Sequence, residues 1–167
     1  ADSTLKIMQS LYEKHKVLTY PRTSSRFISE DILPKLSERV NNLKEVPVYK
    51  DLATQIQDNN LKFSSRIVND KKITDHHAII PTEKKPSLNA FSEEERLIYD
   101  LVIKRFLAAY FGDCVKNHTE IITEIAGHPF RSVGTILVEK GWRTAYSADD
   151  SKEQSDDIIL PAVLKDD

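Results

Sequence analysis

Residues 92–112 decide the fold and read SEEERLIYDLVIKRFLAAYFG. Ser92 with Glu95 three positions later is a capping-box pattern, in which a hydroxyl and a carboxylate satisfy the first free N–H groups of a helix. Apolar side chains then recur up to the glycine at position 112, a residue type that often follows a helix end. The sequence predicts one long helix that carries these apolar residues: Leu97, Leu101, Val102, Phe106, Leu107 and Tyr110.

Shorter apolar patterns upstream of this helix predict three more helices. They cover residues 5–15, 29–43 and 49–56, where apolar side chains recur at helical spacing. Residues 17–20 are predicted to be extended, because Pro21 disfavours the helical conformation for Tyr20. Residues 63–85 are polar and contain prolines, which is typical of a long ordered loop.

The pattern of apolar residues changes in the last third of the chain. Residues 119–125 and 130–138 are rich in β-branched side chains and are separated by a turn residue, Gly127. These features predict two strands joined by a tight turn. Residues 141–146 are predicted to form a third, short strand, and residues 158–164 are a last apolar segment.

These patterns together predict an α+β protein. We expect an α-rich domain over residues 1–116, followed by a small antiparallel β segment over residues 117–167 that includes an acidic loop at residues 147–157. A segment of about 50 residues buries too little surface to form a stable core alone. The β segment is therefore expected to belong to a second domain that is incomplete in this chain.

The composition limits the class of protein. The chain has 167 residues, with 24 Lys and Arg against 26 Asp and Glu and a net charge of -2, so as a whole it is not a basic nucleic-acid binder. No run approaches the roughly 20 apolar residues of a membrane span, and no signal-peptide pattern opens the chain. A single cysteine, Cys114, excludes an internal disulfide and a cysteine-rich zinc site. We expect a soluble, intracellular protein with no membrane partner.

Charge is unevenly distributed along the chain. Residues 1–85 hold 15 basic and 11 acidic side chains, a net of +4, whereas the rest of the chain nets -6. Residues 14–26 include four basic side chains and no acidic one. On charge alone, a solvated face explains such a patch, and contact with phosphate is the more specific alternative.

The strongest candidate catalytic side chains lie in residues 18–26, which read LTYPRTSSR. A tyrosine hydroxyl has a pKa of about 10, so its attack on a phosphodiester needs nearby cations that stabilise the developing negative charge. Arg22 is two positions from Tyr20, and its planar guanidinium suits two phosphate oxygens. The simpler interpretation is an ordinary turn, in which Tyr20 anchors the loop and the arginines are solvated.

A second candidate segment, residues 73–82, reads ITDHHAIIPT. Either His76 or His77 has the chemistry to contact a phosphate or relay a proton. Two adjacent histidines with one aspartate do not have the spacing of a helical metal pair, so the pattern does not favour a metal site. A loop histidine satisfied by Asp75 or by the backbone is the simpler interpretation of the spacing.

At these segments the chain resembles the type IA DNA topoisomerases, most closely the topoisomerase III subfamily. Leu11-Tyr-Glu and residues 17–26, VLTYPRTSSR, are similar to the active-site segment of that family, and residues 69–82, NDKKITDHHAIIPT, to its second signature. Residues 95–108 resemble the helix that follows. Residues 141–143 and 160–164, GWR and LPAVL, resemble the later β segment, so the similarity extends over nearly the whole chain.

The resemblance implies a specific reaction. In the family, the residue that matches Tyr20 attacks a single-stranded DNA phosphodiester, becomes linked to the 5′-phosphate and releases a 3′-hydroxyl. Another strand passes through the gap before the break is resealed, without ATP. The match implies that Arg22 stabilises the phosphotyrosine and that His76 engages the phosphate near the scissile position. Contacts with the DNA backbone are implied for the remaining candidates: Thr19, Thr23, Ser25 and Arg26.

The resemblance also implies parts that this chain does not contain. The family's tyrosine domain is α-rich and helix-turn-helix-like, and a Toprim domain that binds Mg²⁺ precedes it. Only 19 residues precede Tyr20, so we expect a fragment that binds no metal itself and is inactive alone. Its expected partners are single-stranded DNA and the Toprim and other domains of the same polypeptide, in the cytoplasm at the bacterial nucleoid. One departure is Ser24, which stands where the family usually has Asp.

Other functions remain open on the residues alone. A non-catalytic helix-turn-helix module that uses residues 14–26 as a phosphate-contact patch predicts salt-sensitive DNA binding that does not need the Tyr20 hydroxyl. A protein-interaction domain that uses the acidic tail predicts no DNA affinity. A tyrosine recombinase or type IB enzyme would give a 3′-linkage instead of a 5′-linkage.

Overall fold

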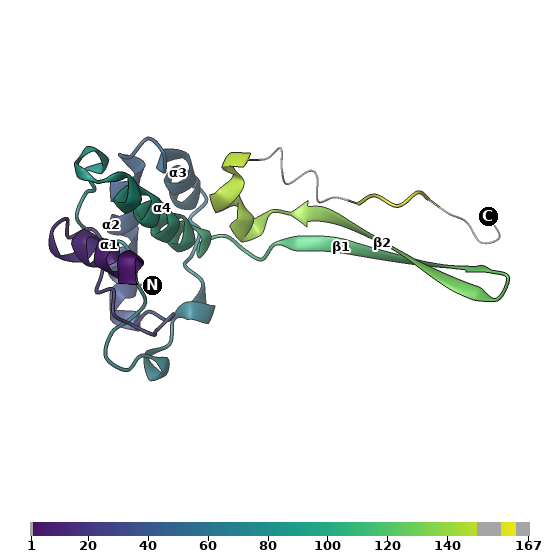
Figure 1. The fold of residues 1–167 in the computed structure, drawn as a ribbon. Coiled ribbons are helices and arrows are strands. Elements are labelled where there is room, and N and C mark those ends of the chain that lie inside the picture. Colours follow the sequence, from purple (N-terminus) through teal and green to yellow (C-terminus); the bar gives the residue numbers. More distant parts are fainter. Residues whose placement is uncertain (1, 150–157, 163–167) are drawn as a thin grey trace. The chain divides into compact units, whose positions relative to one another are not determined.

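The computed structural model describes residues 2–149 and 158–162 and shows an α+β fold (Figure 1). Contacts between residues divide the chain into a helical unit, residues 1–111, and a β unit, residues 112–167. The division falls a few residues before the expected boundary at 116/117, and β1, which begins at Val115, lies entirely in the β unit. No helix in the described part of the chain is long and apolar enough to cross a membrane.

The helical unit confirms the helices predicted from the apolar patterns. Its α-helices are α1 (Asp2–Glu13), α2 (Leu33–Lys44), α3 (Lys50–Asp58) and α4 (Glu93–Ala108). Short 3-10 turns lie at Glu30–Ile32, Ser65–Ile67, Asp70–Lys72 and Leu88–Ala90. Pro34 lies in the first turn of α2, where the missing N–H leaves no helical hydrogen bond unmade.

The capping box predicted for α4 is present. The Glu95 N–H donates to the Ser92 hydroxyl at 3.2 Å, and the Ser92 N–H donates to the Glu95 carboxylate at 2.8 Å. The helix therefore begins where the sequence indicated.

The buried face of α4 differs from the apolar pattern that suggested the helix. Tyr99, Ile103 and Leu107 are at most 1% exposed, whereas Leu97 and Leu101 are 66% and 59% exposed. Residues 99, 103 and 107 recur every four positions and form one stripe. Leu97 and Leu101 each lie two positions before a member of that stripe, about 200° around the helix, so they face solvent.

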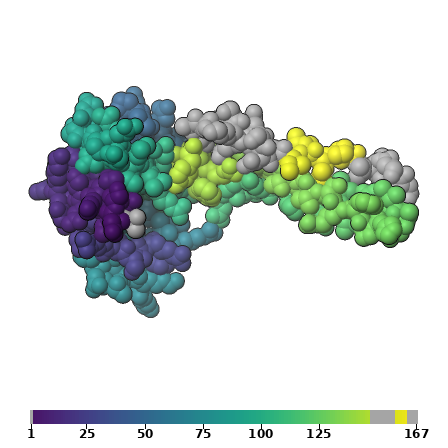
Figure 2. Space-filling model, viewed as in Figure 1, coloured from purple at the N-terminus to yellow at the C-terminus, as the bar shows by residue number. Residues whose placement is uncertain are grey.

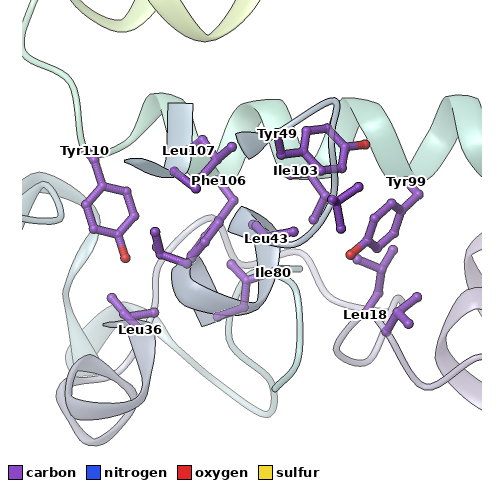
Figure 3. Close-up of a cluster of buried hydrophobic side chains, with 14 of the residues drawn as sticks. Leu18, Leu36, Leu43, Tyr49, Ile80, Tyr99, Ile103, Phe106, Leu107 and Tyr110 are labelled. Atoms are coloured by element: carbon purple, nitrogen blue, oxygen red, sulfur yellow. The ribbon is translucent and has the colours of Figure 1, made fainter. Parts of the chain in front are cut away.

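One apolar cluster holds the helical unit together, with residues from all four helices and from the two candidate loops (Figure 3). Leu18 and Ile80 come from the loops, and both are buried in it, at 1% and 4% exposed. The two candidate segments are therefore fixed to the same core as α4. The residues labelled in the close-up are Leu18, Leu36, Leu43, Tyr49, Ile80, Tyr99, Ile103, Phe106, Leu107 and Tyr110.

The β unit is built on an antiparallel hairpin of β1 (Val115–Ile125) and β2 (His128–Glu139). Ala126 and Gly127 form the turn with φ of 52° and 79°, the left-handed pair that suits a two-residue hairpin loop. This confirms the two predicted strands and the turn at Gly127.

A third segment pairs with β2. Thr135 and Ile158 exchange backbone hydrogen bonds of 3.0 Å, and in Figure 2 the segment 158–162, in yellow, runs alongside the green strands. The close approach depends on Gly134, where an added Cβ would lie 2.7 Å from the Ile158 carbonyl oxygen.

The predicted third strand at residues 141–146 is wrong, because these residues begin the 3-10 segment η5 (Gly141–Asp149). Gly141 has a φ of +49°, a left-handed value that turns the chain out of an extended path. The rings of Trp142 and Tyr146 then meet at 5.9 Å, four positions apart as in a helical turn. Most of the predicted acidic loop, residues 150–157, and the end of the last apolar segment lie outside the described residues.

Candidate active site

The segment that ends in Tyr20 lies antiparallel to residues 80–82. The Thr19 N–H donates to the Ile80 carbonyl at 3.0 Å, and the Thr82 N–H donates to the Val17 carbonyl at 3.0 Å. This pairing brings together the two candidate segments, which are about 60 residues apart in the sequence. It explains how Tyr20 and His76 come to share one site.

The ring of Tyr20 is half-buried between two other rings. The centroid of the His76 ring lies 4.4 Å away, with the planes tilted by 44°. The ring of Tyr12, from the last turn of α1, lies 5.4 Å away and meets Tyr20 edge to face at 82°. His76 itself is exposed, so both a tyrosine and an imidazole are accessible at the same point.

The structure distinguishes between the two adjacent histidines. His77 is half-buried, and its Nδ1 hydrogen-bonds to the carbonyl of Ala78 at 2.6 Å. Of the two adjacent histidines, His76 is the one whose ring lies beside Tyr20.

The hydroxyls beside Tyr20 hold the loop in place. Thr19 Oγ1 accepts from the Ile80 N–H at 3.0 Å and donates to the Ala78 carbonyl at 3.3 Å. Thr23 Oγ1 donates to the His76 carbonyl at 2.9 Å and accepts from the Ser25 N–H at 3.0 Å. The threonine hydroxyls therefore join the loop that carries Tyr20 to backbone groups of residues 76–80.

Ser25 is also tied to its own loop. Its hydroxyl accepts from the Phe27 N–H at 3.1 Å and donates to the Phe27 carbonyl at 3.2 Å. Ser24, which stands where the family usually has Asp, is exposed.

The two arginines of the motif project into solvent. Arg22 is exposed, and its guanidinium makes no hydrogen bond or ion pair with any residue that the structure describes. The guanidinium of Arg26 lies 5.5 Å from the centre of the Phe27 ring, and Lys72 Nζ lies 5.0 Å from the same ring. The side of the loop that carries Arg22 therefore offers an unpaired cation.

Comparison with known proteins finds similarity over the whole chain. A family model described as DNA topoisomerase covers residues 1–167. The chain belongs to the DNA topoisomerase family. It is 43% identical over 170 residues to DNA topoisomerase 3 of Bacillus subtilis (strain 168), and 41% identical over 169 residues to DNA topoisomerase 3 of Bacillus licheniformis. Each alignment covers all of this chain but only 23% of the relative, so the chain spans about a quarter of the relatives it matches.

These matches confirm the resemblance to type IA topoisomerases and to topoisomerase III in particular. Within this topoisomerase chain, sequence reasoning had assigned no role to Tyr12. The sequence did contain an indication for Tyr12, because Leu11-Tyr-Glu is part of the segment that resembles the family's active-site segment. The spacing of a helix pattern does not show which exposed side chain will touch a loop that folds back onto it.

A buried polar cluster joins the end of α1 to the start of α4. The Ser10 hydroxyl donates to the Glu95 carboxylate at 2.6 Å, and His15 Nε2 lies 3.2 Å from both oxygens of that carboxylate. Burial by itself would raise the pKa of Glu95. The bonds from Ser10, from the Ser92 N–H and from His15 more than offset this and hold the pKa below its ordinary value.

Among residues 2–149 and 158–162, no three His, Cys, Asp or Glu side chains lie together in a way that could hold a metal ion. The described residues therefore do not fit a Mg²⁺ site.

Proposed function

We propose that this chain supplies the nucleophile of a type IA DNA topoisomerase, and that the nucleophile is Tyr20. The observation that carries the proposal is the half-buried Tyr20 ring held against His76, with the unpaired Arg22 two residues away. A phenol that attacks phosphate needs access, orientation and nearby positive charge, and these residues offer all three.

In the proposed reaction, the Tyr20 oxygen attacks a phosphorus atom of single-stranded DNA. A bond forms between that oxygen and phosphorus, and the bond from phosphorus to the 3′-oxygen breaks. The phenol loses its proton, and the released 3′-oxygen gains one. Because the phosphotyrosine keeps the energy of the phosphodiester, the 3′-hydroxyl can reseal the strand after another strand has passed, without ATP.

The neighbouring side chains have separate proposed roles. Arg22 binds two non-bridging phosphate oxygens through its planar guanidinium and stabilises the charge that develops on them. His76 contacts the phosphate near the scissile position. Arg26 contacts the DNA backbone, a type of contact that positions the strand and does not read its sequence.

Thr19, Thr23 and Ser25 are proposed to assist the contact with DNA by fixing the loop. Each hydroxyl already donates to a backbone carbonyl, so its proton is engaged within the protein. Their contribution is to hold Tyr20 and Arg22 at a fixed distance from the strand.

The rest of the reaction is proposed to come from outside this chain. The relatives are about four times longer, and in the family a Toprim domain binds Mg²⁺. We propose that this domain and the remaining domains of the same polypeptide are the partners, that single-stranded DNA in the bacterial nucleoid is the substrate, and that the chain alone does not cleave DNA.

The test is a chimaera in which this chain replaces the matching segment of Bacillus subtilis DNA topoisomerase 3. We expect the chimaera to form a covalent adduct with a single-stranded oligonucleotide, and Tyr20→Phe to abolish it. A 3′-labelled strand should stay with the protein, and a 5′-labelled fragment should be released. The 167-residue chain alone is expected to form no adduct.

Three results would contradict the proposal. They are an adduct that survives Tyr20→Phe, retention of the 5′-labelled fragment, and an unsubstituted chimaera that folds but forms no adduct. Salt-sensitive DNA binding that is unchanged by Tyr20→Phe, without any adduct, would favour the non-catalytic DNA-binding module.

A further inference from the structure

Two rings contact the ring of Tyr20, and they come from separate elements. His76 belongs to the loop that pairs with residues 17–19. Tyr12 belongs to α1, and nothing in the proposed reaction uses it. Tyr12 is 37% exposed, so burial in the core does not explain why an aromatic residue stands at this position.

The turn of α1 that carries Tyr12 is firmly anchored. The neighbouring Leu11 is fully buried, and its carbonyl accepts a bond of 3.0 Å from the Val17 N–H. Three residues after Tyr12, the buried His15 contacts the Glu95 carboxylate at the start of α4. The backbone that carries Tyr12 is therefore held by two contacts, one at Leu11 and one at His15.

A reversal in the direction of the chain brings Tyr20 back to the last turn of α1. Lys16 has a φ of 59°, in the left-handed region that non-glycine residues seldom adopt. After this reversal, residues 17–20 run back past the end of α1, and the rings of Tyr20 and Tyr12 meet edge to face. The contact therefore follows from the path of the backbone.

Orientation matters for a phenolic nucleophile. Attack requires the oxygen to lie about 3–3.5 Å from phosphorus and in line with the leaving oxygen. A half-exposed tyrosine is free to populate several side-chain rotamers, and only some of them point the hydroxyl at the strand. An edge-to-face contact with a ring carried on an anchored helix turn favours one arrangement over the others.

We propose that Tyr12 is a positioning residue for Tyr20, acting through its ring and not its hydroxyl. The proposal rests on the assignment of Tyr20 as the nucleophile. Tyr12 need not touch DNA, because its effect is to raise the fraction of Tyr20 side chains that are oriented for attack.

The kinetic test uses the same chimaera and compares Tyr12→Ala, Tyr12→Leu and Tyr12→Phe in single-turnover cleavage. We expect Tyr12→Ala and Tyr12→Leu to lower the maximal cleavage rate by about two- to tenfold, the range for loss of one aromatic pair. The oligonucleotide concentration at half-maximal rate should change little. Tyr12→Phe keeps the ring and should restore the rate. Glu13→Ala, an exposed change on the same helix turn, is the matched control.

A second measurement reports on the ring contact itself. In the 167-residue chain with ring-labelled tyrosine, the NMR signals of the Tyr20 ring should move when Tyr12→Ala removes the neighbouring ring current. They should stay near their original positions in Tyr12→Phe. Thermal unfolding of each variant shows whether a change in rate is accompanied by a loss of the fold.

The outcomes separate this inference from the proposed function. If Tyr20→Phe abolishes the adduct while Tyr12→Ala cleaves at the unsubstituted rate, the positioning role is wrong and the nucleophile assignment stands. A Tyr12→Phe variant as slow as Tyr12→Ala would also overturn the role of the ring. Unchanged Tyr20 ring signals in Tyr12→Ala would show that the two rings are not in contact. An adduct in Tyr20→Phe would instead overturn the proposed function.

Discussion

The tyrosines of this chain differ in what surrounds each phenol. Tyr49, Tyr99 and Tyr110 are at most 9% exposed, and burial raises the pKa of each, with Asp100 adding to the effect at Tyr49. A raised pKa disfavours the phenolate, and burial keeps a DNA strand away, so these three are unsuited to attack a phosphodiester. Tyr20 is only half-buried, so its ring is not enclosed in the core.

At the same scale, a substitution at Arg22 can show whether the phosphate is bound by positive charge alone or by the paired N–H donors of the planar guanidinium. Arg22→Lys keeps the charge but loses the paired N–H donors, so we expect cleavage by the chimaera to fall by about 10- to 100-fold, the range for a lost charge-assisted hydrogen bond. Single-turnover cleavage measures the change. Arg105→Lys, on the exposed surface of α4, is the control and should leave the rate unchanged. Equal rates for Arg22→Lys and the unsubstituted chimaera would argue against two-point contact with the phosphate.

At the scale of elements, the helices and the hairpin form where local signals indicated them. The capping box starts α4, and the left-handed pair Ala126 and Gly127 joins β1 to β2. Local signals failed at residues 141–146, which were predicted to form a strand but begin a 3-10 segment at Gly141, whose φ is left-handed. Which face of α4 is buried was also not readable, because apolar residues occur on both sides of that helix.

The pairing of residues 158–162 with β2 should depend on Gly134, because glycine has no Cβ and leaves room for the Ile158 carbonyl. In Gly134→Ala the added Cβ would lie 2.7 Å from the Ile158 carbonyl oxygen, so that segment must move away. We expect the Ile158 amide, which donates to Thr135 at 3.0 Å, to exchange its hydrogen about five- to tenfold faster. Hydrogen exchange followed by NMR measures this. Gly112→Ala is the control, since no atom lies within 4 Å of its added Cβ, and equal exchange rates in the two variants would contradict the expectation.

At the scale of the whole molecule, one carboxylate links elements that are distant in sequence. Glu95 caps α4 and also accepts from Ser10 of α1, 85 residues away. The pKa of Glu95 is held below its ordinary value in the folded protein, so its ionised form stabilises the fold at neutral pH. That contribution is lost as the pH falls through the ordinary carboxyl range toward the lowered pKa.

Substitution of Glu95 should therefore change both stability and its dependence on pH. Glu95→Gln removes the charge and one acceptor, so we expect it to lower the free energy of unfolding by about 1–3 kcal/mol at pH 7. The difference from the unsubstituted chain should shrink as the pH falls below about 4.5, because the Glu95 carboxyl is then protonated in the unfolded chain, and at still lower pH also in the folded protein. Denaturant unfolding at several pH values measures it, with the exposed Glu38→Gln as control. A difference that stays constant from pH 7 to pH 3 would contradict the role of the charge.

The sequence by itself determined the α+β class, the four helices, the hairpin and the candidate residues Tyr20, Arg22 and His76. Caps, turns and apolar spacing act between residues that are close in the chain, so they can be read locally. Only the tertiary structure decided that His76, and not His77, contacts Tyr20, and that Tyr12 lies against the same ring. Those contacts require the reversal at Lys16 and the pairing of segments about 60 residues apart, which depend on how the whole core packs.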